Sequence, residues 1–90
     1  MIAFVFLQTV PQQGDAAKFV TRIPEVEEVH RVAGEDSYIV RVRVANTEDL
    51  GRLVRERIET IKSVSSARTT LVLKTLKDKE PGISRALAAR

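Results

Sequence analysis

The 90-residue chain contains no cysteine and no tryptophan, and it has one histidine, one tyrosine and three phenylalanines. The absence of cysteine excludes disulfide bonds and thiolate metal sites, and it favours the cytoplasm, where disulfides are rare. A single histidine among scattered carboxylates does not define a metal site. No phosphate-cradling glycine loop is present either. The sequence therefore predicts a cytoplasmic protein with no metal and no cofactor.

Long apolar segments and a concentration of one charge sign are also missing. The apolar run at residues 2–7 is too short to span a bilayer and lacks a basic leader, so we expect neither a signal peptide nor a membrane anchor. The net charge is +3, and the basic residues lie among acidic neighbours. Because nucleic-acid-binding domains concentrate positive charge on one face, we expect a solvated surface and no direct contact with nucleic acid.

Hydrophobic residues make up 43% of the chain, which is enough for one small folded domain. We place the domain at residues 1–76. Residues 77–90 form a C-terminal tail that contains a proline and a glycine. Apolar spacing late in this tail is compatible with a short helix, although a frayed terminus fits the same residues better.

The first half of the domain shows strand and helix periodicities in turn. Residues 2–10 are apolar on both alternating faces, which is typical of a strand covered on both sides. Asp15 is the expected cap of a helix that ends before Pro24. Two further strands are expected at residues 26–32 and 38–45. The apolar stripe of the helix consists of Ala16, Phe19, Val20 and Ile23.

The second half repeats the change from helix to strand. Thr47 is the expected cap of the next helix, and Glu48 and Arg52 are spaced for a surface ion pair. Residues 62–66 are expected to form a loop, and residues 67–76 alternate as a last strand. The buried stripe of this helix consists of Leu50, Leu53, Val54, Ile58 and Ile61.

This order predicts an α+β, ferredoxin-like β-α-β-β-α-β fold, with two helices on one face of a four-stranded antiparallel sheet. The other face keeps apolar side chains that one 90-residue chain cannot cover. We therefore expect a second copy to cover it, making a dimer through that face. RNA-recognition domains share the element order, but they stack bases on aromatic strand residues, and only Tyr38 is aromatic in the third strand.

Catalysis has little support in the sequence. His30 is the only histidine, and it lies in a strand pattern without a surrounding motif. Adjacent carboxylates at Glu35 and Asp36 diverge on an extended strand, so they are unsuited to sharing a proton. A small dimeric ferredoxin-like oxygenase would need a deep pocket with a convergent acid or base. We expect no enzyme activity.

A ligand-binding role fits the turn between the second and third strands better. Backbone N–H groups around Gly34 can bind a carboxylate, and the side chains of Glu35, Asp36 and Ser37 can accept from an ammonium group. Thr69 and Thr70 on the last strand add hydroxyls if packing between subunits brings them close. The alternative stays open that these residues form an ordinary solvent-exposed turn.

Two segments resemble the effector-binding domain of the leucine-responsive regulator/AsnC family, also called the RAM domain. Residues 32–42 (VAGEDSYIVRV) resemble its strand–glycine–acidic–strand hairpin, and residues 64–73 (VSSARTTLVL) resemble its closing strand. The resemblance implies face-to-face dimers, often assembled into rings, with amino-acid effectors bound near the hairpin between dimers. It places Gly34, Glu35, Asp36 and Ser37 in the effector loop.

The same resemblance matches Thr69 and Thr70 to polar positions of the closing strand. It departs from the family at Ser37, where many members have aspartate. Family regulators also carry an N-terminal helix-turn-helix, whereas this sequence opens on the first strand, as in stand-alone members. We therefore expect an amino-acid-sensing oligomerisation module without its own DNA-binding domain, acting on amino-acid metabolism and able to assemble with full-length regulators. The alternative is a structural or protein-interaction module without a ligand.

Overall fold

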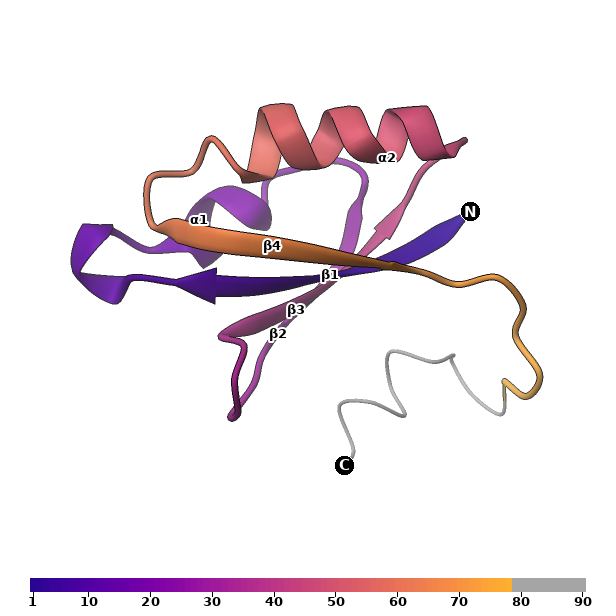
Figure 1. Ribbon diagram of the computed structural model, residues 1–90, viewed down its shortest axis with the longest axis horizontal. Coiled ribbons are helices and arrows are strands. Elements are labelled where there is room, and N and C mark those ends of the chain that lie inside the picture. Colours follow the sequence, from indigo (N-terminus) through magenta and orange to yellow (C-terminus); the bar gives the residue numbers. More distant parts are fainter. Residues whose placement is uncertain (79–90) are drawn as a thin grey trace.

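The computed structural model describes residues 1–78 of the chain. Four strands form one antiparallel sheet in the order β2-β3-β1-β4, and both helices lie on the same side of it (Figure 1). This is the predicted ferredoxin-like arrangement. The strands are β1 (Ile2–Thr9), β2 (Val26–Arg31), β3 (Tyr38–Arg43) and β4 (Val64–Leu71), and the α-helices are α1 (Ala16–Val20) and α2 (Thr47–Leu53). A short 3-10 helix, η1 (Pro11–Gln13), precedes α1, and a π-helical segment, η2 (Val54–Ile58), continues α2 directly.

The hydrophobic core lies between the sheet and the helices. Alternate residues of β1 face the helices, and the largest of them, Leu7, is fully buried together with Ile58 of η2. The stripe expected for the second helix is confirmed across α2 and η2, because four of its five residues are buried and Ile61 packs against them. The core consists of Ala3, Val5, Leu7, Val20, Ile23, Val40, Val42, Val44, Leu50, Leu53, Val54 and Ile58.

The sequence-based expectation for the first helix is only partly correct. Asp15 is the N-cap, and its carboxylate accepts a hydrogen bond from the Ala17 N–H at 3.1 Å. The helix, however, ends at Val20 and is only 5 residues long. Phe19 was assigned to the buried stripe, and this is wrong: its exposed fraction is 51%. So short a helix turns only one narrow side to the sheet, and Phe19 lies off that side.

Two expectations at the second helix are also corrected. The N-cap is Asn46, not Thr47, because the Asn46 side chain accepts from the Asp49 N–H at 2.7 Å. The expected pair of Glu48 with Arg52 is replaced by Asp49 with Arg52, at 3.3 Å. Helical residues three apart are also neighbours, so the closer carboxylate takes the guanidinium.

The last strand lies earlier in the chain than expected. It spans Val64–Leu71, so part of the expected loop at residues 62–66 is strand, and the expected end at residue 76 is wrong. The register explains its C-terminal limit. Leu71 is paired with Ala3, and the Val72 N–H donates to the Ile2 carbonyl at the very start of β1. Beyond this point the neighbouring strand offers no further partner.

The proposed boundary at residue 76 falls close to the end of the described chain. The short helix predicted in the tail lies outside the described residues. Within residues 1–78, no helix is long and apolar enough to cross a membrane.

The sheet face opposite the helices carries apolar side chains from β1 and β3. Phe4 and Phe6 lie on this face, since they are in register with Arg41 and Ile39, whereas Val5 and Leu7 alternate to the core. We call this surface, formed by Ile2, Phe4, Phe6, Ile39, Arg41 and Thr70, the open face. Phe4 is already buried in one chain, with an exposed fraction of 4%, but Ile2, Phe6 and Ile39 are only partly buried, which agrees with the expected second layer.

Candidate functional site

The connection between β2 and β3 is a short turn that extends from the sheet on the side away from the helices (Figure 1). We call residues 32–37 the hairpin turn. The Val32 N–H donates to the Ser37 carbonyl at 3.0 Å and closes it. Gly34 has φ 146°, a conformation that residues with a side chain rarely adopt. The glycine is therefore required by the backbone of this turn.

Hydrogen bonds fix the hairpin turn to the end of β1. The Ser37 N–H donates to the Leu7 carbonyl at 2.7 Å, and the Ser37 hydroxyl accepts from the Thr9 N–H at 3.2 Å. The Gln8 side-chain amide donates to the Glu35 carbonyl at 3.4 Å, and its oxygen accepts from the Ser66 hydroxyl at 3.2 Å. Ser37 thus holds the turn in place, and only its remaining hydroxyl capacity is left for a ligand.

Asp36 is joined to the last strand by an ion pair. Its Oδ2 lies 3.1 Å from Nη2 of Arg68, and the guanidinium of Arg68 lies 4.7 Å from the centroid of the Phe6 ring. Cation–π and charge-assisted contacts of this kind both favour a fixed guanidinium plane. Three segments far apart in sequence therefore meet beside the hairpin turn.

Two open depressions flank the hairpin turn. The depression on the helix side has a volume of about 720 Å³ and includes Pro11, Asp15 and Arg31 in its lining. The depression on the open-face side has a volume of about 640 Å³ and includes Phe6 and Ile39. Both volumes fall within the range of small-molecule sites. Gly34, Glu35 and Asp36 line both depressions, and Ser37 lines only the helix-side one.

The predicted site residues are only partly brought together. Gly34, Glu35, Asp36 and Ser37 are consecutive in the hairpin turn, but the two threonines lie further along β4. Thr69 is in register with Val5 and Thr70 with Phe4, so their side chains point to opposite faces of the sheet. Thr69 lines a small depression beside α2. Within one chain, neither threonine lines the depressions at the hairpin turn.

Two residues whose side chains contact the hairpin turn from other strands, Gln8 and Arg68, were missed by sequence reasoning. Their positions depend on the strand register, which places Gln8 opposite Ser66 and Arg68 opposite Phe6. Neither residue belongs to a local motif. The one available signal was that five of the six residues at 65–70 are polar, in an otherwise apolar strand pattern.

His30 belongs to a charged network on the open face. Its Nε2 lies 3.0 Å from Oε1 of Glu28, and Oε2 of Glu28 lies 3.1 Å from Nη1 of Arg41. Glu27 lies 3.1 Å from Arg41 and 2.7 Å from Arg43. The His30–Glu28 pair lies within β2, and the pairs of Glu27 and Glu28 with the arginines connect β2 to β3, so the role of the network is structural. Among residues 1–78 there is no cluster of side chains suited to a metal ion.

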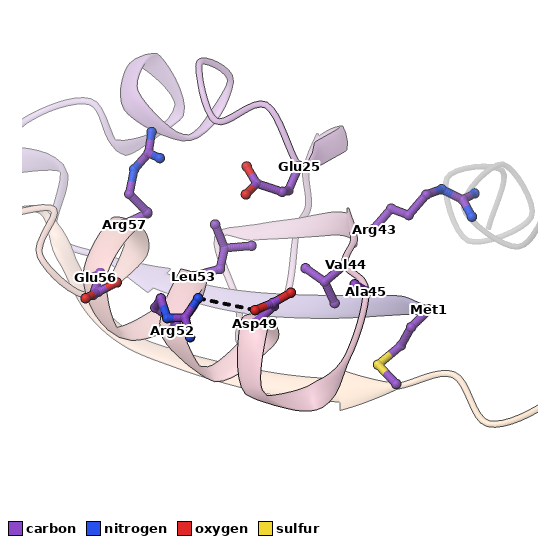
Figure 2. Close-up of a pocket in the computed structure, with 10 residues that line it drawn as sticks. All are labelled: Met1, Glu25, Arg43, Val44, Ala45, Asp49, Arg52, Leu53, Glu56 and Arg57. Atoms are coloured by element: carbon purple, nitrogen blue, oxygen red, sulfur yellow. Dashed lines mark hydrogen bonds and ion pairs between the residues drawn. The ribbon is translucent and has the colours of Figure 1, made fainter.

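A further depression of about 660 Å³ lies at the other end of β1, beside the start of α2 (Figure 2). Apolar side chains such as Leu53 lie between charged ones, and the Arg52–Asp49 pair stands at its edge. It contains none of the residues predicted for the site.

Comparison with known proteins agrees with the fold and with the resemblance to the family. Residues 2–81 match the Lrp/AsnC ligand binding domain. An uncharacterized HTH-type transcriptional regulator of Pyrococcus furiosus is 38% identical over 80 residues, which cover 84% of this chain and 53% of that protein. The chain thus spans about half the length of this relative.

Solved structures give the same result. A feast or famine regulatory protein of M. tuberculosis, complexed with L-methionine, is 38% identical with a TM-score of 0.77, over 91% of this chain and 56% of that chain. E. coli AsnC is 20% identical, with a TM-score of 0.79, and the match covers 84% of this chain and 52% of the AsnC chain. This likeness shows the shared fold. The chain belongs to the Lrp/AsnC ligand-binding domain family, which includes transcriptional regulators.

Proposed function

We propose that this chain is a non-enzymatic module that senses an amino acid and transmits the signal through its assembly, in the transcriptional regulation of amino-acid metabolism. Family membership supports a regulatory role. The M. tuberculosis relative complexed with L-methionine supports an amino acid as the ligand. The module comprises residues 1–76 and acts in the cytoplasm, as the cysteine-free composition favours.

The observation that carries the proposal is the fixed hairpin turn. Gly34, at φ 146°, places exposed backbone next to the carboxylate of Asp36, which the ion pair with Arg68 fixes. One depression opens on each side of the turn. A zwitterion needs donors for its carboxylate and acceptors for its ammonium group, and the turn offers both. Glu35 adds an exposed carboxylate at the tip.

The open face supports a homodimer, and ring-like assembly of dimers would place hairpin turns at the contacts between subunits. Phe6 and Ile39 are only half-buried in one chain, and apolar area of this kind favours association. In such contacts, Thr69 or Thr70 of a neighbouring copy can complete the effector site. Mixed assembly with full-length regulators of the family would link this module to DNA. By linkage, an effector shifts the assembly only if it binds two assembly states unequally.

One observation favours the alternative, a structural or interaction module with no small ligand. The hydroxyl of Ser37, the carbonyl of Glu35 and the carboxylate of Asp36 all have partners within the chain. A turn whose polar groups are satisfied in this way needs no ligand to hold its shape.

A thermal-shift measurement with each of the twenty amino acids at millimolar concentration separates the two readings. At about a hundred times its dissociation constant, a ligand adds roughly 2.7 kcal/mol per site, which raises the melting temperature of a domain this small by several degrees. We expect a selective shift that is lost in Asp36→Asn. The matched control is Asp49→Asn, which also removes a carboxylate paired with an arginine, but on α2. A flat response to all twenty would favour the structural module.

A further inference from the structure

We propose that a groove between α1 and η2 binds an acidic segment of another protein, anchored by one apolar side chain. The groove has a volume of about 450 Å³ and lies between residues 19–23 and residues 56–62. We call it the α1–η2 groove. It is on the helix side of the sheet, opposite the open face, and contains no residue of the hairpin turn (Figure 1). The proposal therefore stands independently of amino-acid sensing.

Apolar side chains line one part of the α1–η2 groove. Phe19 is exposed, although its neighbours Val20 and Ile23 are buried in the core. Ile61 is only partly buried and lines the same groove. One exposed apolar side chain is ordinary on a protein surface. Here, however, an exposed aromatic ring and a partly buried aliphatic chain line one hollow that is large enough to accept a side chain.

The charged side chains of the groove are mostly basic. Arg22, Arg57 and Lys62 line it together with one carboxylate, that of Glu56. All three cations are exposed, and none of them has an ion-pair partner among residues 1–78. Three cations against one carboxylate leave an excess of two positive charges. The described chain does not neutralise this excess, so an acidic partner is favoured.

The depressions described above lack such an excess of positive charge. The depression beside the start of α2 is lined by three arginines and three carboxylates, so its side-chain charges cancel. Both depressions at the hairpin turn have more acidic than basic side chains, with histidine counted as neutral. The α1–η2 groove adjoins the first of these at Glu56 and Arg57, which line both, and Figure 2 shows Arg57 pointing from η2 toward α1.

The π-helical turn η2 carries part of the basic lining. Its hydrogen bonding is of the π type, since the Glu59 N–H donates to the Val54 carbonyl at 2.7 Å. Such turns are rare and are frequent at functional sites. Arg55 and Arg57 are both exposed on this turn, but Arg57 lines the groove, whereas Arg55 lines a separate depression beside β4. The two arginines therefore form a matched pair for a test.

The charge and the apolar lining together define the partner. A segment rich in carboxylates neutralises the excess charge, and an aromatic or aliphatic side chain within it contacts Phe19 and Ile61. Residues 79–90 of the chain itself contain three basic residues and one acidic residue, so they are poorly matched to the groove. The net charge of +3 also opposes a second copy. A phosphate backbone would leave the apolar lining unused.

Fluorescence anisotropy with the full chain and labelled synthetic peptides tests the proposal. The probe is a short peptide of glutamates around a central phenylalanine–leucine pair. One control peptide has lysines in place of the glutamates, and another has alanines in place of the apolar pair. We expect the probe to bind at least about tenfold more tightly than either control, because a few exposed charge contacts and one apolar contact each contribute a few-fold.

Two variants of the groove and one matched control complete the test. Arg57→Gln should weaken binding of the probe about three- to tenfold, while Arg55→Gln, the same loss of charge on the same turn, should leave it within about twofold. Phe19→Ala should weaken binding about tenfold. Since all three side chains are exposed, the variants should stay folded, which thermal melting checks.

Several results would overturn the proposal. No binding of the probe to the wild type at about millimolar concentration is one, and equal binding by Arg57→Gln and Arg55→Gln is another. A smaller mass of Arg57→Gln than of the wild type in light scattering would assign the groove to a second copy. Tighter binding of duplex DNA than of the probe, lost in Arg57→Gln, would assign it to nucleic acid. None of these results bears on the thermal-shift response to amino acids, so the proposed function is tested separately.

Discussion

Replacement of Gly34 by alanine should destabilise the protein purely through the backbone of the hairpin turn. Within the described chain, a Cβ built on Gly34 has no atom within 4 Å, so steric overlap with neighbours contributes nothing. The cost arises because φ at this position is +146°, where residues with a side chain are strained. Strain of this type amounts to about 1–3 kcal/mol. For a domain of this size, that lowers the melting temperature by at least about 4 °C.

Gly51→Ala is the matched control, because the same methyl group is added where the backbone is helical. Gly51 lies inside α2, and a Cβ there also meets nothing within 4 Å among the described residues. Alanine is favoured over glycine in a helix by about 0.5–1 kcal/mol, so this variant should be more stable than the wild type. Gly14→Ala, at φ +132°, should resemble Gly34→Ala in sign.

Equilibrium unfolding in urea, at one fixed protein concentration, measures the three variants on the same scale. The expected result is a lower midpoint for Gly34→Ala and Gly14→Ala and a higher one for Gly51→Ala. Equal midpoints for Gly34→Ala and Gly51→Ala would refute the argument, since space around the two glycines is the same and only φ differs.

Two further outcomes follow from the corrected helix cap and from the open face. Asn46→Ala should lower the free energy of unfolding by about 1 kcal/mol, because it removes the acceptor of the Asp49 N–H. Thr47→Ala should lower it clearly less. The reverse order in urea unfolding would contradict the assigned cap. Phe6→Asp should shift the protein to monomer, as measured by light scattering coupled to gel filtration. Phe19 lies on the helix side, so Phe19→Asp should leave the mass unchanged. A dimeric Phe6→Asp variant would argue against association through the open face.

Much of the fold could be predicted because the decisive information is local. Alternation in residues 2–10 and the apolar stripe of α2 and η2 each depend on side chains that are close in sequence, and both agree with the buried residues. Boundaries were less reliable. Asn46 and Thr47 are both good caps, and only the direction of the chain entering α2 decides which side chain reaches the Asp49 N–H.

The end of β4 shows a different limit. Its apolar alternation continues past Leu71, but β1 begins at Ile2 and provides no partner further on. The length of one strand is thus set by another strand almost seventy positions away. Contacts at the candidate site depend on the same kind of information. Gly34 and Asp36 could be identified from a local turn pattern, whereas Arg68 comes beside them only through the register of β1 with β4.

The strand order also has a consequence for how the molecule is made. β1 is first in the chain but lies inside the sheet, between β3 and β4, and β4 is last and lies at an edge. A growing chain can therefore form the β2–β3 hairpin early, because its strands are neighbours in sequence, while β1 must wait for partners that emerge later. Asp36 meets Arg68 across 32 positions, and Gln8 meets Ser66 across 58. The partners of the turn on β1 are thus present before the turn is made, whereas Ser66 and Arg68 arrive after it, and the full set of polar contacts forms only when β4 adds to the sheet.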